Sequence, residues 1–532
     1  MKNYDLYSHT PVCTIKELLS FCVSEYAEKE AFTYQNRKQD ISISFSRFKK
    51  EVDALGSYLF HEEFKNMHIA VFGENSYEWI LTHFSVTCGG NVIVPIDKEL
   101  DADSISELLI DSKSCLLVYS NTYADIVEQL QGKIPNIKYM NMKDIPQYIA
   151  KGMQLVSRGY DEFLDKQVSK DDLASIVYTS GTTGKSKGVM LTHNNFCSCM
   201  YGACCNVSLT GASLLVLPLH HTFGVVASVF AVMYYGYPIY INKSLKKLVD
   251  DFQKAKPQQL FAVPLIVETL YKNIWIDAKK QGKDKLLQRL IKVSDALLKC
   301  KIDLRKVLFR SVISAFGGNL DLIVSGGAPI DEKYIRAFHS LGITILNGYG
   351  ITECGPIVAV NRNRFNVVGS VGFPLICNDV KIAEDGEVLV KGDNVMLGYY
   401  HNEVENEKVF VDGWFKTGDL GRIDEHGALH ITGRIKNLII LGNGENIPAE
   451  SLEERIYTIP YVKEVIVYGK DNMIIAEVYL DEDVADAKER IHTDIQSMNQ
   501  KLPLTRNIGQ IVIRDTEFPK TTTKKIKRNY GG

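Results

Sequence analysis

The segment Tyr178–Val189 combines residue types that bind phosphate groups. It reads YTSGTTGKSKGV and holds several hydroxyl side chains, three glycines and two lysines. Glycines let a backbone fold closely around a ligand. Hydroxyl and N–H groups bind phosphate oxygens, and lysines offset their charge. An apolar run, Leu173–Val177, comes directly before it. We therefore expect a nucleotide-phosphate loop that follows a strand.

This loop is not a Walker A motif. Gly184, Lys185 and Ser186 supply the end of that motif, but Thr179 stands where its first glycine is required. On composition alone, a solvated Ser/Gly loop without a ligand is about as good an interpretation. The other motifs must decide between the two.

A pair of histidines follows the next strand-like run. His220 and His221 lie in the sequence PLHHTFG, after the strand-like run 213–217. A histidine there can bind an anion or border a pocket, although a histidine satisfied at a strand end is the commoner case. No carboxylate lies between residues 218 and 229. Because a buried ammonium without a partner is costly, this absence argues against an amino-acid substrate.

Two glycine-containing turns follow further strands. Ser325–Pro329 reads SGGAP, and its small residues allow a flat base to lie on the backbone. Asn347–Glu353 reads NGYGITE, in which Tyr349 can stack on a base. Glu353 lies four residues after this tyrosine and is an oxygen ligand of the kind that Mg²⁺ prefers.

The last third of the chain adds candidate polar contacts. Asp419 lies in the turn sequence KTGDLG, and Arg434 follows fifteen residues later. The tail 519–528 reads PKTTTKKIKR. A disordered basic tail or a polyanion-binding patch is the plain interpretation of that composition.

The order of these motifs resembles the adenylate-forming superfamily, which includes acyl-CoA synthetases, nonribosomal peptide synthetase adenylation domains and beetle luciferases. The resemblance covers almost the whole chain. It implies that Glu353 holds Mg²⁺ and that Lys525 is the catalytic lysine, with His221 and Thr182 also catalytic. Lys524 stands where the family usually has glycine, and it remains a rival for the role of Lys525. The resemblance implies ATP and AMP contacts from Thr179, Ser180, Gly181, Thr182, Thr183, Gly184, Lys185, Gly327, Ala328, Pro329, Asn347, Gly348, Tyr349, Gly350, Thr352, Asp419 and Arg434.

These motifs need a scaffold of several layers. Strand-like and helix-like segments alternate over most of the chain, which favours α/β layers with parallel strands. Residues 246–306 have a long, basic, helical pattern. After residue 370, apolar and polar residues alternate, which predicts a small antiparallel β subdomain. From about residue 436 the pattern indicates a compact α+β unit.

The resemblance implies a large N-terminal adenylating domain (1–434), a hinge (435–436) and a small mobile C-terminal domain (437–532). Lys436 matches the hinge position. Gly442 and Gly444 match a loop that lines the thiol tunnel.

Composition narrows the class of protein. The chain has 532 residues, with 61 Lys and Arg against 64 Asp and Glu, so its charge does not favour nucleic acid. No window predicts a transmembrane span, and residues 1–5 lack a signal-peptide core. Eleven cysteines without a CxxC pair favour a reducing, cytoplasmic setting. A metal site at the cysteines between 197 and 205 is a weaker alternative to buried thiols.

We therefore expect an AMP-forming acid–thiol ligase that uses ATP, Mg²⁺ and coenzyme A. The expected substrate is a fatty or other apolar carboxylic acid. Two alternatives stay open: a ligase that loads the phosphopantetheine of a carrier protein in trans, and a CoA ligase for aryl or short-chain acids. A binding protein without catalysis is disfavoured, because Glu353, Asp419 and Arg434 are all present.

Overall fold

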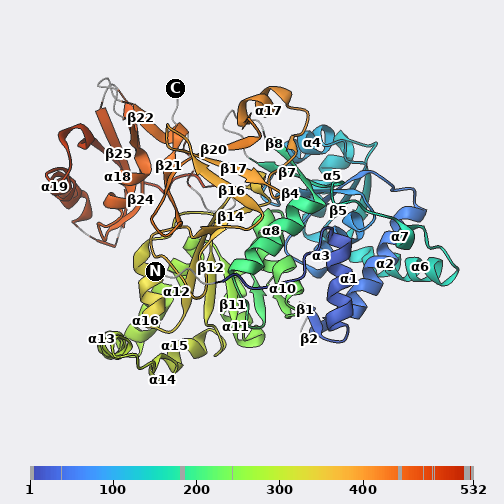
Figure 1. Cartoon of the computed structure of the whole chain (residues 1–532), viewed down its shortest axis with the longest axis horizontal. Helices are drawn as coiled ribbons and strands as arrows, with labels where there is room; N and C mark the ends of the chain where they lie inside the picture. Colours follow the sequence, from blue (N-terminus) through green and yellow to red (C-terminus); the bar gives the residue numbers. More distant parts are fainter. Residues whose placement is uncertain are drawn as a thin grey trace. The chain divides into compact units, whose positions relative to one another are not determined.

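The computed structural model describes residues 5–36, 39–179, 186–242, 244–440, 446–470, 473–481, 483–484, 486–520, 526 and 528. These residues form an α/β structure in two compact units (Figure 1). The first unit comprises Met1–Asp379 and Val390–Phe415, and the second comprises Val380–Leu389 and Lys416–Gly532. This division differs from the expected boundary at 434. The hinge at 435–436 concerns movement, and it stays a prediction.

A nine-stranded sheet carries the expected base-binding turns. Its central strands β9 to β13 pair in parallel, and antiparallel strands complete both edges. In spatial order its strands are β15 (Phe373–Pro374), β14 (Ile357–Val360), β13 (Thr344–Gly350), β12 (Leu322–Ser325), β11 (Gln259–Ala262), β9 (Ser213–Leu215), β10 (Ile239–Ile241), β1 (Glu30–Asn36) and β2 (Gln39–Ser44).

A seven-stranded sheet carries the expected phosphate loop. Its strands β3 and β4 are buried along their whole length apart from His68, as their apolar sequences predict. Its strands are, in order, β18 (Gly398–Tyr399), β8 (Lys187–Thr192), β7 (Leu173–Thr179), β4 (Val92–Ile96), β3 (His68–Phe72), β5 (Leu116–Tyr119) and β6 (Lys138–Asn141).

Helices cover these two sheets and pack between them. Helix α8 contacts both β8 and β14, and it lies between the two sheets in Figure 1. Its Phe196 ring lies 6.1 Å from Phe230, which in turn lies 5.4 Å from Phe84 of α3. The helices up to this region are α1 (Ile15–Tyr26), α2 (Phe45–His61), α3 (Tyr77–Thr87), α4 (Ala102–Asp111), α5 (Ala124–Lys133), α6 (Ile145–Ser157), α7 (Glu162–Asp165), α8 (His193–Asn206), α9 (Thr222–Val225), η3 (Val226–Phe230) and α10 (Ala231–Tyr234).

The pattern of the basic region 246–306 suggested helix throughout. The structure instead has a strand within it. Strand β11 interrupts it, because its four residues are fully buried at the centre of the sheet. A short buried run cannot be told from helix by periodicity alone. The remaining helices of the first unit are α11 (Leu248–Ala255), α12 (Pro264–Lys280), α13 (Asp284–Lys299), α14 (Arg305–Leu308), α15 (Arg310–Ala315), α16 (Glu332–Ser340) and α17 (Glu403–Val409).

The second unit has its own apolar core. Strands β24 and β25 pair antiparallel, and α18 and α19 contribute buried Leu452 and Ile491 to the same cluster. The antiparallel strands expected after residue 370 are present, and some of them span the division between the units. This part of the chain contains β16 (Asn378–Ile382), β17 (Glu387–Gly392), β19 (Phe410–Val411), β20 (Trp414–Ile423), β21 (Leu429–Arg434), β22 (Leu438–Ile440), β23 (Asn446–Pro448), α18 (Ala449–Ile456), β24 (Val462–Lys470), β25 (Met473–Leu480), α19 (Ala487–Asn499) and β26 (Ile508–Arg514).

Close packing of α6 on α2 supplies a test of this fold. A Cβ at Gly152 of α6 would lie 1.8 Å from the carbonyl oxygen of Ala54. We expect Gly152→Ala to lower the free energy of unfolding by about 1–3 kcal/mol, because the backbones must separate. Denaturant midpoints, followed by circular dichroism, measure this change.

Gly132→Ala is the matched control. Gly132 lies in α5, and no atom lies within 4 Å of the position that its Cβ would take. This substitution should be neutral or stabilise by up to about 1 kcal/mol, because alanine favours helix. Equal midpoints for the two variants would contradict the α2–α6 packing.

Candidate functional site

The two turns that the sequence predicts to bind a base lie side by side in the first unit. Strands β12 and β13 run parallel, with Ser325 opposite Asn347. Both chains therefore leave the sheet at the same edge, where open α/β sheets bind ligands. The turn after β12 contains Gly327, whose φ of +84° suits glycine, together with Ala328 and Pro329.

The second turn, at Gly348, and the segment after the histidines, at Phe223, both pack against the first turn at Gly326. A Cβ at Gly326 would lie 3.3 Å from the ring of Phe223 and 3.6 Å from the carbonyl oxygen of Gly348. Three segments that are distant in sequence thus meet around Gly326. Tyr349 and Gly350 complete β13, and Thr352 begins the short helix η5 (Thr352–Cys354).

Two buried polar groups at this edge lack a hydrogen-bond partner among the described residues. The side-chain Nδ2 of Asn347 donates to the carbonyl of Ser370 over 3.0 Å. Its Oδ1 has no hydrogen-bond partner among the described residues, and neither does the hydroxyl oxygen of Ser325. Leaving such a group unpaired costs about 1–3 kcal/mol. The site is therefore suited to a ligand that presents an N–H group, such as the amine of a flat base.

The two histidines lie at the start of helix α9. Their ring centroids are 4.3 Å apart, and His221 is the residue before the helix begins. Burial lowers the pKa of His220 to about 3, so this imidazole is neutral near pH 7, although its Nε2 lies 3.4 Å from Asp97 Oδ1. His221 is the more exposed of the two.

A closely packed apolar cluster includes Leu219, the residue before His220, and leaves no room for a water molecule. Its polar exceptions are the Trp79 indole N–H and His83, and burial lowers the pKa of His83 to about 3, so that the cluster carries no charge. Its residues are Trp79, Ile80, His83, Phe84, Leu219, Val225, Val229 and Phe230.

Glu353 is held by a residue that the sequence did not single out. Its Oε1 accepts a hydrogen bond from the hydroxyl of Tyr399 over 2.8 Å. Burial and the nearby Glu353 carboxylate raise the pKa of Tyr399, so the phenol stays a donor at neutral pH. The backbone carbonyl of Glu353 also accepts from the N–H of Met396 over 2.8 Å. The strand β18 segment thus fixes both ends of this glutamate.

Lys187 connects Tyr399 with helix α17. Its Nζ lies 5.1 Å from the centroid of the Tyr399 ring and 2.5 Å from an oxygen of Glu405. Hydrogen bonds from Lys187 and Lys408 lower the pKa of Glu405 to about 2.

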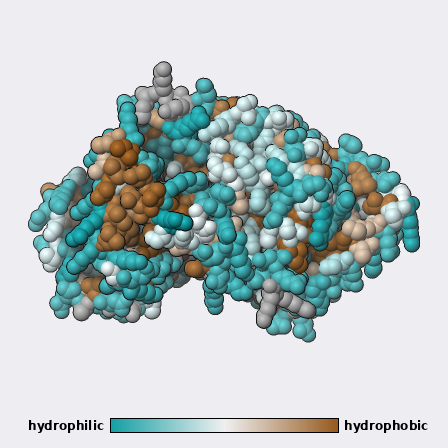
Figure 2. Space-filling view, turned by 90° about the horizontal axis from the view of Figure 1, so that it is seen from below, coloured by the Kyte–Doolittle hydropathy of each residue, from teal (hydrophilic) through white to brown (hydrophobic). Residues whose placement is uncertain are grey.

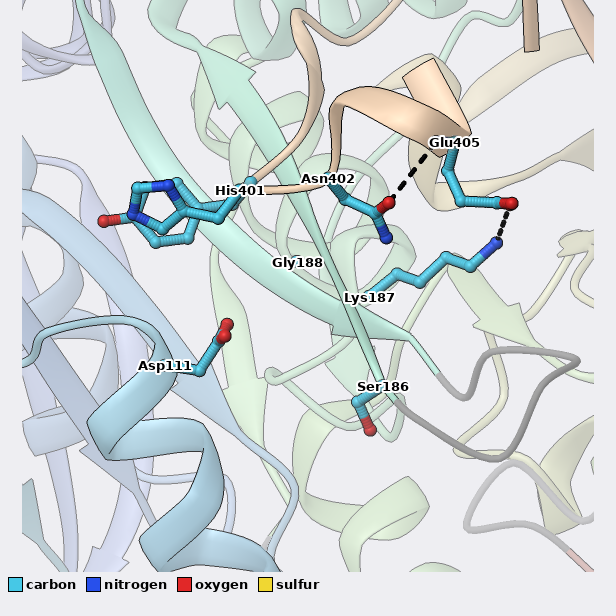
Figure 3. A pocket seen from close by; sticks show the side chains of 8 residues that line it. Asp111, Ser186, Lys187, Gly188, His401, Asn402 and Glu405 are labelled. Atoms are coloured by element: carbon cyan, nitrogen blue, oxygen red, sulfur yellow. Dashed lines mark hydrogen bonds and ion pairs between the residues drawn. The ribbon is translucent and has the colours of Figure 1, made fainter. Parts of the chain in front are cut away.

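Figure 3 shows this ion pair in a cavity of about 250 Å³. The backbone N–H of Glu405 also donates to the side chain of Asn402. The cavity is lined by Asp111, Ser186, Lys187, Gly188, Tyr400, His401, Asn402 and Glu405.

Asp419 and Arg434 lie opposite each other in the second unit. They occupy paired positions of β20 and β21, and Arg434 Nε lies 2.6 Å from Asp419 Oδ1. Glu387, which is 2% exposed, orders the preceding turn by accepting from the N–H of Gly418 over 2.9 Å. Lys416 lies 3.2 Å from the same carboxylate. Sequence reasoning missed Glu387, since no local pattern marks it.

Several expected site residues lie outside the described residues. They are Ser180, Gly181, Thr182, Thr183, Gly184, Lys185, Gly442, Gly444, Lys524 and Lys525. Their described neighbours have defined positions. Thr179 ends β7 opposite Lys187, and Lys436 lies in the short helix η6 (Ile435–Asn437). Lys520 pairs with Glu464, and Arg528 pairs with Glu453, all four within the second unit.

Other kinds of site receive no support from the described part of the chain. No helix there is long and apolar enough to cross a membrane. No group of three or more His, Cys, Asp or Glu residues there is arranged to hold a metal ion. The four cysteines between 197 and 205 are buried free thiols of α8.

Comparisons with known proteins agree with this geometry. Residues 21–400 match the AMP-binding enzyme family. A long-chain-fatty-acid–CoA ligase of Mycobacterium bovis, FadD15, is 31% identical over 75% of this chain and 70% of its own. The chloroplastic long-chain-fatty-acid–[acyl-carrier-protein] ligase AEE15 of Arabidopsis thaliana is 25% identical over 87% of this chain and 77% of its own.

A solved structure has the same fold. The anthranilate CoA ligase AuaEII, in complex with anthranoyl-AMP, superposes with a TM-score of 0.78 at 19% identity, over 99% of this chain and 97% of the other. Because the family match spans most of the chain and coincides with the fold and the order of motifs described above, the chain belongs to the AMP-binding enzyme family.

Proposed function

We propose that the protein joins a long-chain fatty acid to coenzyme A through an acyl-AMP intermediate, with release of pyrophosphate. One observation carries the proposal: the segments around Phe223, Gly326 and Gly348 meet at one edge of the parallel sheet, where a nucleotide site is expected. The similarity to FadD15 supports the choice of a fatty acid and of coenzyme A.

The roles proposed for the nucleotide contacts follow the resemblance to the family. The base would lie on the 326–329 turn beside Tyr349, with its amine donating to the free Oδ1 of Asn347. Asp419 and Arg434 would bind the ribose. The segment from Thr179 to Lys185 would hold the β- and γ-phosphates, which leave as pyrophosphate.

Glu353 fits the role of a magnesium ligand. It presents a hard carboxylate oxygen donor, and Tyr399 orients that carboxylate from one side. When bound, Mg²⁺ would offset the charge that develops on the departing phosphates.

Lys525 would offset the charge repulsion between the two anionic reactants of the first step. The fatty-acid carboxylate and the α-phosphate are both anions, and a lysine between them lowers their repulsion as the new bond forms. Coenzyme A must then reach the same carbonyl carbon. We infer that the C-terminal domain (437–532) turns about Lys436, which removes Lys525 and brings the Gly442–Gly444 loop to the thiol path.

The apolar cluster that includes Leu219 and Phe230 supports a substrate with an apolar chain. It carries no charge, and burial keeps His83 neutral. A charged group on the substrate would lose its hydration there without gaining a partner. A long acyl chain would instead displace side chains of η3 and α3 and bury its own surface.

One alternative acceptor has specific support. The similarity to AEE15 favours a carrier-protein phosphopantetheine in place of coenzyme A, supplied in trans. An aryl or short-chain acid is supported only by a likeness in fold. We infer a cytoplasmic setting from the eleven free cysteines. We infer no nucleic-acid partner from the balance of 61 Lys and Arg against 64 Asp and Glu.

A pyrophosphate-exchange assay tests the reaction and the substrate together. With ATP, Mg²⁺ and a series of carboxylic acids, exchange should be fastest with long-chain fatty acids, because their chains bury their surface in the apolar cluster. Thioester yield should then be higher with coenzyme A than with a phosphopantetheinylated carrier. Exchange that is fastest with amino acids or benzoates would overturn the substrate, and exchange with none would overturn the reaction.

Lys525→Ala separates the two half reactions. We expect pyrophosphate exchange to fall by about 10²–10³-fold, because one preorganised charge partner is lost. Thioester formation from supplied acyl-AMP and coenzyme A should keep its rate. Lys524→Ala is the matched control and should leave both steps intact. If the two substitutions have the same effect, or if Lys525→Ala impairs both steps equally, the assignment is wrong.

Tyr399→Phe tests the support of Glu353. Removing the hydroxyl should raise the Mg²⁺ concentration for half-maximal exchange by about tenfold, because the carboxylate loses its orienting donor. Electron paramagnetic resonance of Mn²⁺ with ATP should show a matching loss of affinity. Tyr400→Phe is the control, since Tyr400 packs against His401 and His68 instead. A lower maximal rate at unchanged metal affinity would contradict the role.

A further inference from the structure

An apolar and cationic surface covers helices α12–α15 of the first unit. We call residues 264–315 the helical face. Figure 2 shows brown side chains gathered where this face is seen from below. Seven large apolar residues of the face are between 44% and 74% exposed, and they are Leu265, Ile276, Leu286, Val293, Ile302, Leu304 and Val307.

Helix α13 shows why this exposure is unusual. Leu286 and Val293 are seven residues apart, so they lie on one side of the helix. Leu287 and Ser294, one position further along, are buried against the core. The helix therefore has apolar side chains toward the core and also on a side that faces solvent. Core packing does not account for the second set.

Positive charge surrounds these apolar residues. Residues 264–315 contain twelve Lys and Arg against five Asp and Glu, whereas the whole chain has 61 against 64. On α13, exposed Lys285, Arg289 and Lys292 lie beside Leu286 and Val293. Long cationic side chains can keep their charge in water while their stems cover apolar surface.

We propose that the helical face docks the protein on the surface of a membrane that contains anionic lipids. Apolar side chains would enter the boundary between headgroups and acyl chains, and the flanking lysines and arginines would meet lipid phosphates. The combination of exposed apolar residues with a local excess of cations is the pattern of such interfacial helices. The contact that we propose is with the membrane surface, and no described helix is long and apolar enough to cross a membrane.

The charge complementarity favours lipid over a second copy of the chain. Two copies meeting through this face would bring two sets of twelve cations together and repel each other. Docking goes beyond the proposed function and does not depend on it. If the substrate is a long-chain acid, which dissolves in bilayers, docking would also place the enzyme at its source.

Vesicle co-sedimentation tests the proposal on the full chain. The protein should bind vesicles of phosphatidylcholine with phosphatidylglycerol, bind pure phosphatidylcholine much less, and dissociate at high salt because charges are screened. The charge variant Lys285→Glu/Arg289→Glu/Lys292→Glu should lower binding by at least about tenfold. The apolar variant Leu286→Ser/Val293→Ser/Val307→Ser should weaken binding to a similar extent at low salt.

Matched variants elsewhere in the first unit control for general effects. Lys133→Glu/Lys151→Glu/Lys170→Glu changes the net charge equally at other exposed lysines. Ile110→Ser/Met153→Ser/Ile376→Ser removes three apolar residues that are 61%, 46% and 58% exposed. Both controls should bind vesicles like the unchanged protein.

Three results would overturn the proposal. The first is equal binding to neutral and anionic vesicles. The second is a loss of vesicle binding in the control variants as large as in the charge and apolar variants. The third is self-association, seen by light scattering, that the apolar variant abolishes. Pyrophosphate exchange, measured without vesicles, should be unchanged in all four variants. Failure of exchange in the unchanged protein would refute the proposed reaction and leave the vesicle result standing.

Discussion

Parallel pairing of β12 with β13 is the constraint on which the candidate site depends. Because the two strands run in the same direction, both carboxyl ends reach one edge, and Ser325 lies opposite Asn347. Residues 326 and 348 then lie close together, since a Cβ at Gly326 would lie 3.6 Å from the carbonyl oxygen of Gly348. An antiparallel pairing would place these turns at opposite edges of the sheet. The apolar sequences that bury the strands are therefore also what assembles the site.

A second regularity concerns acidic residues within each of the two units. Glu353, Asp419 and Glu387 are each held by a donor from a neighbouring segment: Tyr399, Arg434 and the Gly418 N–H respectively. A carboxylate that is already oriented loses less conformational freedom when it meets a ligand. Lys187 extends the support of Glu353 to α17 through Tyr399 and Glu405.

The sequence predicted the local elements better than the contacts between them. The apolar run before the phosphate loop, Leu173–Val177, was expected as a strand and forms β7 (Leu173–Thr179), since its burial follows from its own residues. Strand β11 was missed because four buried residues have no distinctive period. Tyr399 was missed because its partner is 46 residues away. A clue was available, since Gly398-Tyr399 repeats the glycine–aromatic pairing of Gly348-Tyr349.

The unpaired oxygen of Asn347 has a consequence for nucleotide choice. Its desolvation is already complete in the folded chain, and its Nδ2 is fixed on the Ser370 carbonyl, so the side chain is not free to turn over and offer a donor. A base that presents an amine there relieves an existing penalty. A base that presents a carbonyl, as in inosine or guanosine nucleotides, would set two acceptors against each other. With the base bound as proposed, this oxygen would favour a purine that presents an amine over one that presents a carbonyl.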